Sequence, residues 1–288
     1  MTASSVAAKR AFPHLDTKSV FGSCALNEAA SEAWRLATDR ELPADIRKAN
    51  RKRIPAGQFG PFDVTVENLR FRAYPAENRC DRIIVGRGVL PEGQEHELLA
   101  PFLGSGAIFV DIGANVGTYA LWAARRVGPA GIVIALEPHP RTFAKLEFNC
   151  MANGAENIRC LNVAAGPEAG AAMLHFDGGG NIGGASLLAS QTADRRADVM
   201  VAIRPLADIL LEQKILRIDV IKVDVEGYED RALLSYFDHA SRDCWPKTIM
   251  IETVLSGRWE RDCLAELAKR GYERVAGTTE NVILQLAR

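Results

Sequence analysis

The stretch from Ile108 to Thr118 reads Ile-Phe-Val-Asp-Ile-Gly-Ala-Asn-Val-Gly-Thr, an apolar run that breaks into a glycine turn. The apolar residues predict a buried strand, and Gly113 and Gly117 let the backbone turn tightly and approach a ligand closely. From Thr118 onward, apolar residues recur at helical spacing. A strand that feeds a helix through a glycine turn is typical of nucleotide-binding α/β folds.

Two acids indicate the kind of ligand. Glu137 ends a second apolar run, residues 131–136, where nucleotide-binding folds hydrogen-bond the ribose hydroxyls. Asp111 stands before the glycine turn, where a carboxylate would repel a pyrophosphate but attract the ammonium and sulfonium of S-adenosyl-L-methionine. The Gly-x-Gly-x-x-Gly spacing of dinucleotide sites is not met. We expect S-adenosyl-L-methionine as cofactor; a dinucleotide site and a turn used only for packing are the alternatives.

Composition limits the class of protein and its partners. The 288 residues can bury a full core, and one catalytic domain with an N-terminal addition fits this length. The net charge of −1 offers no global basic field, so we expect neither a nucleic-acid nor a membrane partner. Six scattered cysteines without a CxxC pair argue against zinc and a disulfide framework. The N-terminus has no signal-peptide pattern, so we expect a cytoplasmic protein.

The chain before the glycine turn divides into two predicted parts. Residues 1–60 are expected to be a partly flexible helical segment, with helices between 26 and 53 interrupted at Pro43. Residues 61–91 are expected to be a small β addition, in which Glu67 and Asn68 turn between two strands and a third strand covers 82–85.

Residues 92–288 are expected to form the catalytic domain. Strands alternate with helices, which predicts a doubly wound, Rossmann-like, mostly parallel seven-stranded sheet with a C-terminal antiparallel hairpin at 272–286. The pattern predicts helices at 92–103, 141–152, 206–213, 229–237 and 263–270, and further strands at 157–165, 173–176, 199–203, 219–224 and 248–252. The stretch 177–187 has five glycines in eleven positions and is predicted to be a substrate loop or lid rather than a structural turn.

Five acids fall at the predicted carboxyl ends of four strands, where ligands of such sheets bind. They are Asp111, Glu137, Asp224, Glu226 and Glu252. Collected in one cleft, they indicate a cationic ligand or a metal. No histidine accompanies them at ligand spacing, so we expect no metal site.

Three segments resemble the signatures of the FkbM family of methyltransferases: residues 109–117, 135–140 and 221–229. The similarity runs from about residue 92 to 272. The resemblance implies a class I S-adenosylmethionine-dependent fold and O-methylation of hydroxyls on sugars or polyketides. It does not name the acceptor.

By this resemblance, Asp111 and Gly113 line the methionine end of the cofactor, Glu137 takes the ribose, and Asp224 lies near the reacting methyl group. Val163 and Ala164 would border the adenine. The full set of expected cofactor residues is Asp111, Gly113, Ala114, Asn115, Gly117, Thr118, Glu137, Pro138, His139, Val163, Ala164 and Asp224.

Methyl transfer needs chiefly alignment of the acceptor oxygen with the methyl group, and a base can accept the hydroxyl proton. Asp224 or Glu226 is the first choice of base, followed by His175 and then His139, which more simply borders the adenine. We expect a small-molecule hydroxyl acceptor, and the sequence leaves a homodimer open. A methyltransferase of proteins or nucleic acids and a non-catalytic adenosylmethionine-binding protein are the alternatives.

Overall fold

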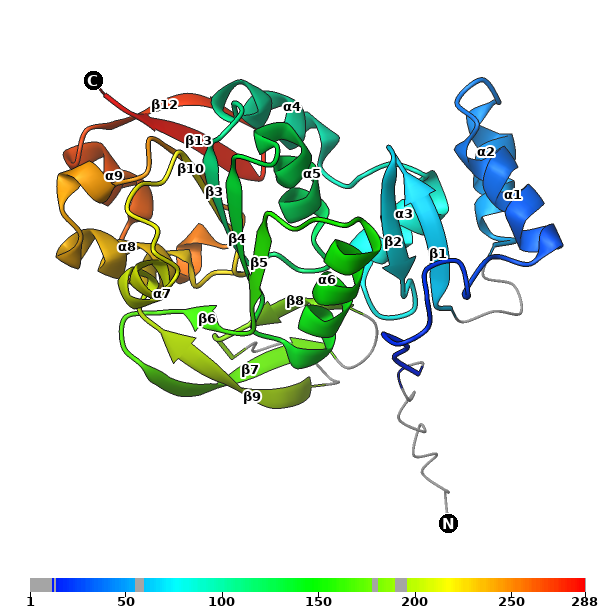
Figure 1. Cartoon of the computed structure of the whole chain (residues 1–288), viewed down its shortest axis with the longest axis horizontal. Coiled ribbons are helices and arrows are strands. Elements are labelled where there is room, and N and C mark those ends of the chain that lie inside the picture. Colours follow the sequence, from blue (N-terminus) through cyan, green and yellow to red (C-terminus); the bar gives the residue numbers. More distant parts are fainter. Residues whose placement is uncertain (1–11, 13, 55–59, 178–180, 190–195, 288) are drawn as a thin grey trace, which may run out of the picture.

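A seven-stranded sheet forms the centre of the protein (Figure 1). The computed structural model describes residues 12, 14–54, 60–177, 181–189 and 196–287. The strand order is β12-β13-β11-β10-β3-β4-β5, and β13 alone runs opposite to the other six strands. The strands are β3 (Ile108–Ile112), β4 (Ile132–Leu136), β5 (Ile158–Leu161), β10 (Val220–Val223), β11 (Thr248–Glu252), β12 (Tyr272–Gly277) and β13 (Asn281–Leu286). The predicted Rossmann-like sheet with its C-terminal hairpin is confirmed.

Helices cover both faces of this sheet (Figure 1). One face carries α4 (Gly93–Leu99), the short η1 (Ala100–Phe102), α5 (Thr118–Val127) and α6 (Pro140–Ala152); the other carries α7 (Leu206–Glu212), α8 (Glu229–His239) and α9 (Cys263–Lys269). Side chains along β3 alternate between the two faces of the sheet. Phe109 packs in the hydrophobic core shared with α5 and α6, whereas Val110 and Ile112 pack in the core shared with α7 and α8. The parallel strands are buried on both faces, as their apolar sequences predict.

A second, four-stranded sheet lies beside the first and was not foreseen as a separate layer. Its order is β6-β9-β7-β8, with β6 (Ala164–Ala165), β7 (Gly170–Asp177), β8 (Asn181–Ser186) and β9 (Arg196–Arg204). The single strand predicted over 157–165 is therefore two strands in different sheets. The chain leaves the main sheet at Asn162, whose side-chain amide donates to the carbonyls of Glu137 and Pro138 at 2.8 and 2.9 Å.

The prediction of a loop over 177–187 is wrong for the strand Asn181–Ser186. The glycines there do not prevent pairing with β7, where Asn181 lies opposite Asp177 and Ser186 opposite His175. Ile182 is buried, and its N–H donates to the carbonyl of Glu77 at 2.8 Å. Ser186 donates its hydroxyl to the carbonyl of Glu226 at 2.8 Å. The first glycines of the stretch, 178–180, lie outside the described residues.

The N-terminal part contains α1 (Glu28–Thr38), α2 (Ala44–Arg51), β1 (Phe62–Val66), β2 (Leu69–Ala73) and α3 (Arg79–Arg87). Both predicted helices and the hairpin turn at Glu67 and Asn68 are confirmed. The strand predicted at 82–85 is wrong, because these residues lie within α3. The Asn78 side chain caps this helix by accepting from the N–H groups of Cys80 and Asp81 at 2.8 and 3.3 Å. The short apolar run is the buried side of a helix.

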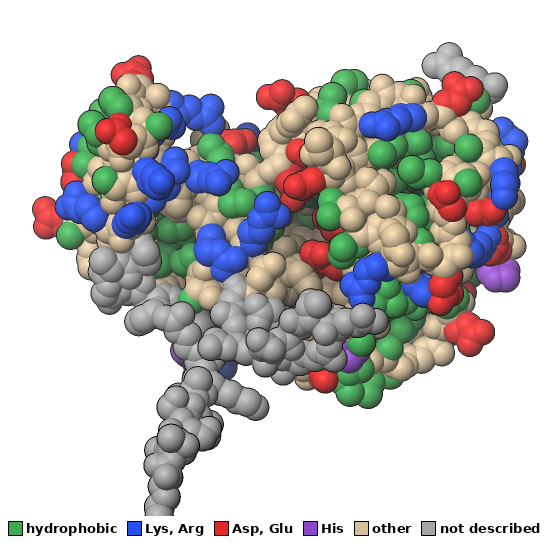
Figure 2. All heavy atoms as spheres, turned by 180° about the vertical axis from the view of Figure 1, so that it is seen from behind, with side chains coloured by type: hydrophobic (Ala, Val, Ile, Leu, Met, Phe, Trp, Pro, Cys, Tyr) green, Lys and Arg blue, Asp and Glu red, His purple; other side chains and the backbone are tan. Residues whose placement is uncertain are grey.

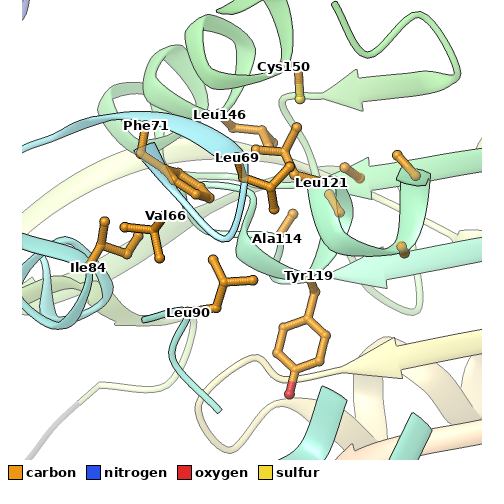
Figure 3. Close-up of a cluster of buried hydrophobic side chains, with 14 of the residues drawn as sticks. Val66, Leu69, Phe71, Ile84, Leu90, Ala114, Tyr119, Leu121, Leu146 and Cys150 are labelled. Atoms are coloured by element: carbon orange, nitrogen blue, oxygen red, sulfur yellow. The ribbon is translucent and has the colours of Figure 1, made fainter. Parts of the chain in front are cut away.

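The hairpin and α3 share one hydrophobic core with the helices of the main sheet (Figure 3). Val66 and Phe71 of the hairpin and Ile84 of α3 belong to the same buried cluster as Leu121 of α5 and Leu146 of α6. The N-terminal part is therefore packed firmly enough to present side chains to a site on the main sheet.

Candidate functional site

A pocket lies at the carboxyl ends of four adjacent strands, β11, β10, β3 and β4. Segments that follow these strands line it, together with β8 and the start of α3. Nine of the expected cofactor residues line the pocket: Gly113, Ala114, Asn115, Thr118, Glu137, Pro138, Val163, Ala164 and Asp224. Ligands of open α/β sheets bind at this edge of the sheet.

Gly113 brings the turn after β3 against the loop after β10. Its φ is +85°, and its N–H donates to the carbonyl of Leu136 at 3.0 Å. A Cβ at this position would lie 2.0 Å from the carbonyl oxygen of Asp224. Only glycine fits such a conformation and such a close approach.

The Glu137 carboxylate is held by two backbone donors at the end of β4. One oxygen accepts from the N–H of Asn115 and the other from the N–H of His139, both at 2.9 Å. Burial raises the pKa of Glu137 to about 7, against these two hydrogen bonds. Each oxygen keeps a further lone pair for a ligand hydroxyl.

Lys222 is a site residue that the sequence analysis missed. Its ammonium lies 3.0 Å from Asp224 Oδ2, 3.8 Å from Asp111 Oδ1 and 4.8 Å from the centre of the Tyr119 ring. The aliphatic part of Lys222 belongs to an apolar strand, which hid it among core residues. Lys222 lines the pocket together with Glu92. Glu92 is an acid that the sequence analysis also missed, and burial raises its pKa.

Asp111 does not line the pocket, contrary to its expected contact with the cofactor. It is fully buried in β3 and lies behind Lys222. Burial raises the pKa of Asp111 to about 6, although the nearby Lys222 acts in the opposite direction. Asp111 therefore acts on the pocket through its ion pair with Lys222 and does not line the pocket itself.

Asp224, Glu226 and Glu252 form the acidic wall of the pocket, as the sequence predicted. Burial, and then the charge of Asp224, raise the pKa of Glu226 to about 7 and that of Glu252 to about 9. Glu252 Oε2 is buried and has no hydrogen-bond partner in the described part of the chain. This wall is suited to a cationic ligand or to accepting a proton.

Three further expected site residues lie outside the pocket lining. Gly117 starts α5 with a φ of +93°, and a Cβ there would lie 2.8 Å from Leu146, so its role is packing. His139 caps α6 by accepting from the N–H of Arg141 at 3.2 Å, and its ring packs edge-on against Phe176. His175 Nδ1 lies 2.7 Å from Asp198 Oδ1, on the second sheet. Neither histidine is placed to act as a base in the pocket.

The remaining walls come from α3, which the sequence analysis did not assign to the site, and from β8, which lies in the stretch 177–187 that was predicted to be a substrate loop or lid. Arg79 and Cys80 of α3 and residues Asn181 to Gly183 of β8 line the pocket. The Arg79 N–H donates to Asn181 Oδ1 at 3.0 Å, and Asn78 Nδ2 donates to Asn115 Oδ1 at 2.7 Å. The available signal in the sequence was the group of polar side chains just before the strand predicted at 82–85. A helix that begins at an Asn78 cap explains these polar side chains better than a strand does.

The described ranges also contain no cluster of three or more His, Cys, Asp or Glu side chains arranged to hold a metal ion. Within those same ranges, every helix is too short or too polar to cross a bilayer.

The fold and the position of the pocket define a Rossmann-like α/β protein with a ligand site at the carboxyl ends of its parallel strands. The sequence matches the family described as "Methyltransferase FkbM domain" over residues 111–273, more than half of the chain. This protein belongs to the FkbM family and is a methyltransferase.

Two named relatives are methyltransferases. Methyltransferase sdnD of Sordaria araneosa is 28% identical over 55% of this chain and 68% of its own length. The 31-O-demethyl-FK506 methyltransferase FkbM of Streptomyces tacrolimicus is 26% identical over 49% of this chain and 62% of its own. A solved S-adenosylmethionine-dependent O-methyltransferase of Thermotoga maritima has a TM-score of 0.40 at 14% identity, covering 69% of this chain and 67% of its own.

Proposed function

We propose that this protein transfers a methyl group from S-adenosyl-L-methionine to a hydroxyl group of a small molecule. The observation that carries the proposal is the Glu137 carboxylate, fixed by two backbone N–H groups at the edge of the pocket beside the Gly113 turn. This arrangement is suited to the two ribose hydroxyls of a nucleoside. The name of the Streptomyces relative, a 31-O-demethyl-FK506 methyltransferase, supports oxygen as the acceptor atom.

The residues present fit the cofactor. Val163 and Ala164 give an apolar border for an adenine, and Gly113 keeps the backbone close to the ligand. Within the acidic wall, the carboxylates of Asp224 and Glu226 complement the positive charge of a sulfonium and an ammonium. When bound, S-adenosyl-L-methionine supplies an electrophilic methyl group.

The chain's own contribution is alignment and proton transfer. Glu226 is the favoured base, because it lines the pocket and burial raises its pKa to about 7, close to the value at which a general base works best near neutral pH. Asp224 Oδ2 forms an ion pair with the Lys222 ammonium at 3.0 Å, and this pair helps to hold the acidic wall in place. Glu226 would accept the proton that the acceptor hydroxyl loses in the transfer.

Calorimetry tests the cofactor assignment. S-adenosylmethionine and its demethylated product should bind, and NAD should not. Glu137→Ala should raise the dissociation constant of the cofactor roughly 10- to 100-fold, since a hydrogen bond to a charged group contributes about 1.5–3 kcal/mol. Glu147→Ala on the exposed side of α6 is the matched control and should leave it unchanged. Binding of NAD alone would overturn the assignment, and an unchanged constant in Glu137→Ala would remove Glu137 from the ribose site.

A further inference from the structure

Two cysteine thiols lie against each other at the edge of the main sheet, outside the pocket lining. Cys150 is in the last turn of α6 and Cys160 is in β5, and their Sγ atoms are 3.6 Å apart. Neither residue lines the pocket. All six cysteines lie in the described part of the chain, and each is a free thiol. The contact between Cys150 and Cys160 therefore brings together two sulfur atoms that are both open to covalent chemistry.

The two sulfur atoms are close enough for side-chain rotation to bring them into bonding distance. The S–S bond of a disulfide is about 2.05 Å long, so the sulfur atoms must approach each other by about 1.5 Å. Rotation about the Cα–Cβ bond of a cysteine moves its sulfur over a distance of this size. A disulfide between Cys150 and Cys160 is therefore within reach of the folded protein.

The main chain around the pair is held in place by hydrogen bonds. The N–H of Ala155 donates to the carbonyl of Cys150 at 3.1 Å, at the end of α6. The Asn157 amide donates to the carbonyls of Ala124 and Gly128 at 3.0 and 2.9 Å, which fixes the chain before β5 against the end of α5. The contact between the two sulfur atoms is therefore a feature of the packed fold.

Exposure to solvent differs between the two thiols. Cys150 is 7% exposed and belongs to the same buried cluster as Leu121 and Leu146, at the margin of the side chains drawn in Figure 3. Cys160 is half-buried and packs against this cluster, and β5 is the edge strand of the main sheet. A small oxidant in solution therefore reaches Cys160 more readily than Cys150.

Ionisation favours the same thiol. The hydrogen bond between the two thiols lowers the pKa of Cys160, although burial acts in the opposite direction. The same hydrogen bond and then burial raise the pKa of Cys150. The thiolate, not the thiol, is the nucleophile in cysteine chemistry. An accessible, readily ionised cysteine beside a second thiol that can resolve it is typical of redox-sensing cysteines.

We infer that Cys150 and Cys160 are a modification site, a thiol pair that a peroxide oxidises to a reversible disulfide. Cys160 is the thiol that is attacked first, and Cys150 closes the bond. The inference does not depend on the proposed methyl transfer. Hydrogen peroxide, the simplest such oxidant, is small and uncharged, so surface charges of both signs, such as those in Figure 2, do not exclude it.

The reaction takes two steps. The Cys160 thiolate attacks one oxygen of hydrogen peroxide, the O–O bond breaks, and the leaving hydroxide takes up a proton to form water. The Cys150 sulfur then attacks the sulfur of the sulfenic acid, so that the S–S bond forms, the S–O bond breaks, and the hydroxyl leaves with the Cys150 proton as a second water. The two thiols lose two electrons, and the peroxide gains them. A dithiol such as dithiothreitol reverses the change by thiol–disulfide exchange.

Peptide mapping tests the inference on the full chain. The reduced protein is exposed to hydrogen peroxide, blocked with N-ethylmaleimide before unfolding, and digested with trypsin, which cleaves after Arg159 and so separates the two cysteines. We expect the peptides that carry Cys150 and Cys160 to be joined, with a mass about 2 Da below the sum of the two peptides, and dithiothreitol should separate them.

Serine variants test the order of attack. In Cys150→Ser the sulfenic acid of Cys160 is not resolved, so dimedone, which reacts with sulfenic acids, should label Cys160. In Cys160→Ser the buried Cys150 should take up roughly tenfold less label. Cys244→Ser is the matched control, since Cys244 is also half-buried but its Sγ lies 3.4 Å from the Ser241 hydroxyl rather than beside a thiol. This control should form the disulfide as the wild type does.

The inference is overturned if the oxidised wild type contains no linked peptide, or if other cysteines become linked as readily as Cys150 and Cys160. Equal dimedone labelling in the two single variants would overturn the order of attack. Where Cys150→Ser melts well below the wild type, Cys150→Ala is used in its place. The peptide map of the wild type decides on the disulfide without either variant.

Discussion

The Nζ atom of Lys222 lies 3.0 Å from Asp224 Oδ2 and 3.8 Å from Asp111 Oδ1, so one buried cation sits between two acids. Burial alone would lower the pKa of Lys222, but Asp224 and Asp111 together raise it above its ordinary value. Lys222 therefore remains charged, and it offsets part of the negative charge that the fold collects at the strand ends.

Lys222→Met should lower the free energy of unfolding by about 3–5 kcal/mol, because it leaves the buried Asp111 and the neighbouring Asp224 without their cation. Denaturant unfolding measures this loss. Lys247→Met is the control, since the Lys247 ammonium lies 2.7 Å from Asp219 Oδ1 but its side chain is 65% exposed. That variant should lose less than about 1 kcal/mol. Equal losses in the two variants would contradict a special role for Lys222.

Glu252 should make the ligand-free protein less stable at alkaline pH. Burial and then Asp224 raise the pKa of Glu252 to about 9 in the folded state, above its ordinary value of 4.5. The folded protein then holds the proton more tightly than the unfolded chain. The stabilising effect is complete below about pH 4.5 and is lost as the pH rises through about 9.

Glu252→Gln removes this titration, so its Tm should exceed that of the wild type at pH 8–9 and match it near pH 5. A difference of 1 kcal/mol in a domain of this size corresponds to roughly 2–4 °C. Glu273→Gln, at an exposed position on β12, should follow the wild type throughout. A pH-independent difference between Glu252→Gln and the wild type would show that Glu252 does not titrate in this range.

The sequence predicted the half of the site at the strand ends, because each residue there lies close in sequence to the strand that positions it. Gly113 and Glu137 each follow an apolar strand within a few residues, and parallel strands bring their carboxyl ends to one edge. The other half could not be predicted in this way. Arg79 and Asn181 are about 100 positions apart, and the 3.0 Å hydrogen bond between them exists only because α3 and β8 pack together.

The errors have physical reasons. Residues 82–85 form a short apolar run, whose periodicity does not distinguish a strand from one buried side of a helix. Asn181–Ser186 contains two glycines, which weaken a strand in isolation, yet pairing with β7 and the buried Ile182 compensate. Asp111 was expected in the pocket from its charge and from the family resemblance, but the Lys222 ammonium lies between it and the pocket.

Gly113→Ala should damage both stability and cofactor binding. The added Cβ would lie 2.0 Å from the carbonyl oxygen of Asp224, so the turn after β3 or the loop after β10 must move. A positive φ adds about 1–2 kcal/mol of strain, and overpacking typically adds 1–3 kcal/mol. We expect a combined loss of roughly 2–5 kcal/mol in denaturant unfolding, and a cofactor affinity too weak to measure by calorimetry.

Gly154→Ala separates the two causes of this loss. Gly154 also has a positive φ, +60°, but a Cβ there would meet no atom within 4 Å. It should therefore lose only the strain of about 1–2 kcal/mol and bind the cofactor as the wild type does. The difference between the two variants measures the close approach of the glycine turn to Asp224. If Gly113→Ala were no less stable than Gly154→Ala and still bound S-adenosylmethionine, the contact between the two loops would not be what shapes the pocket.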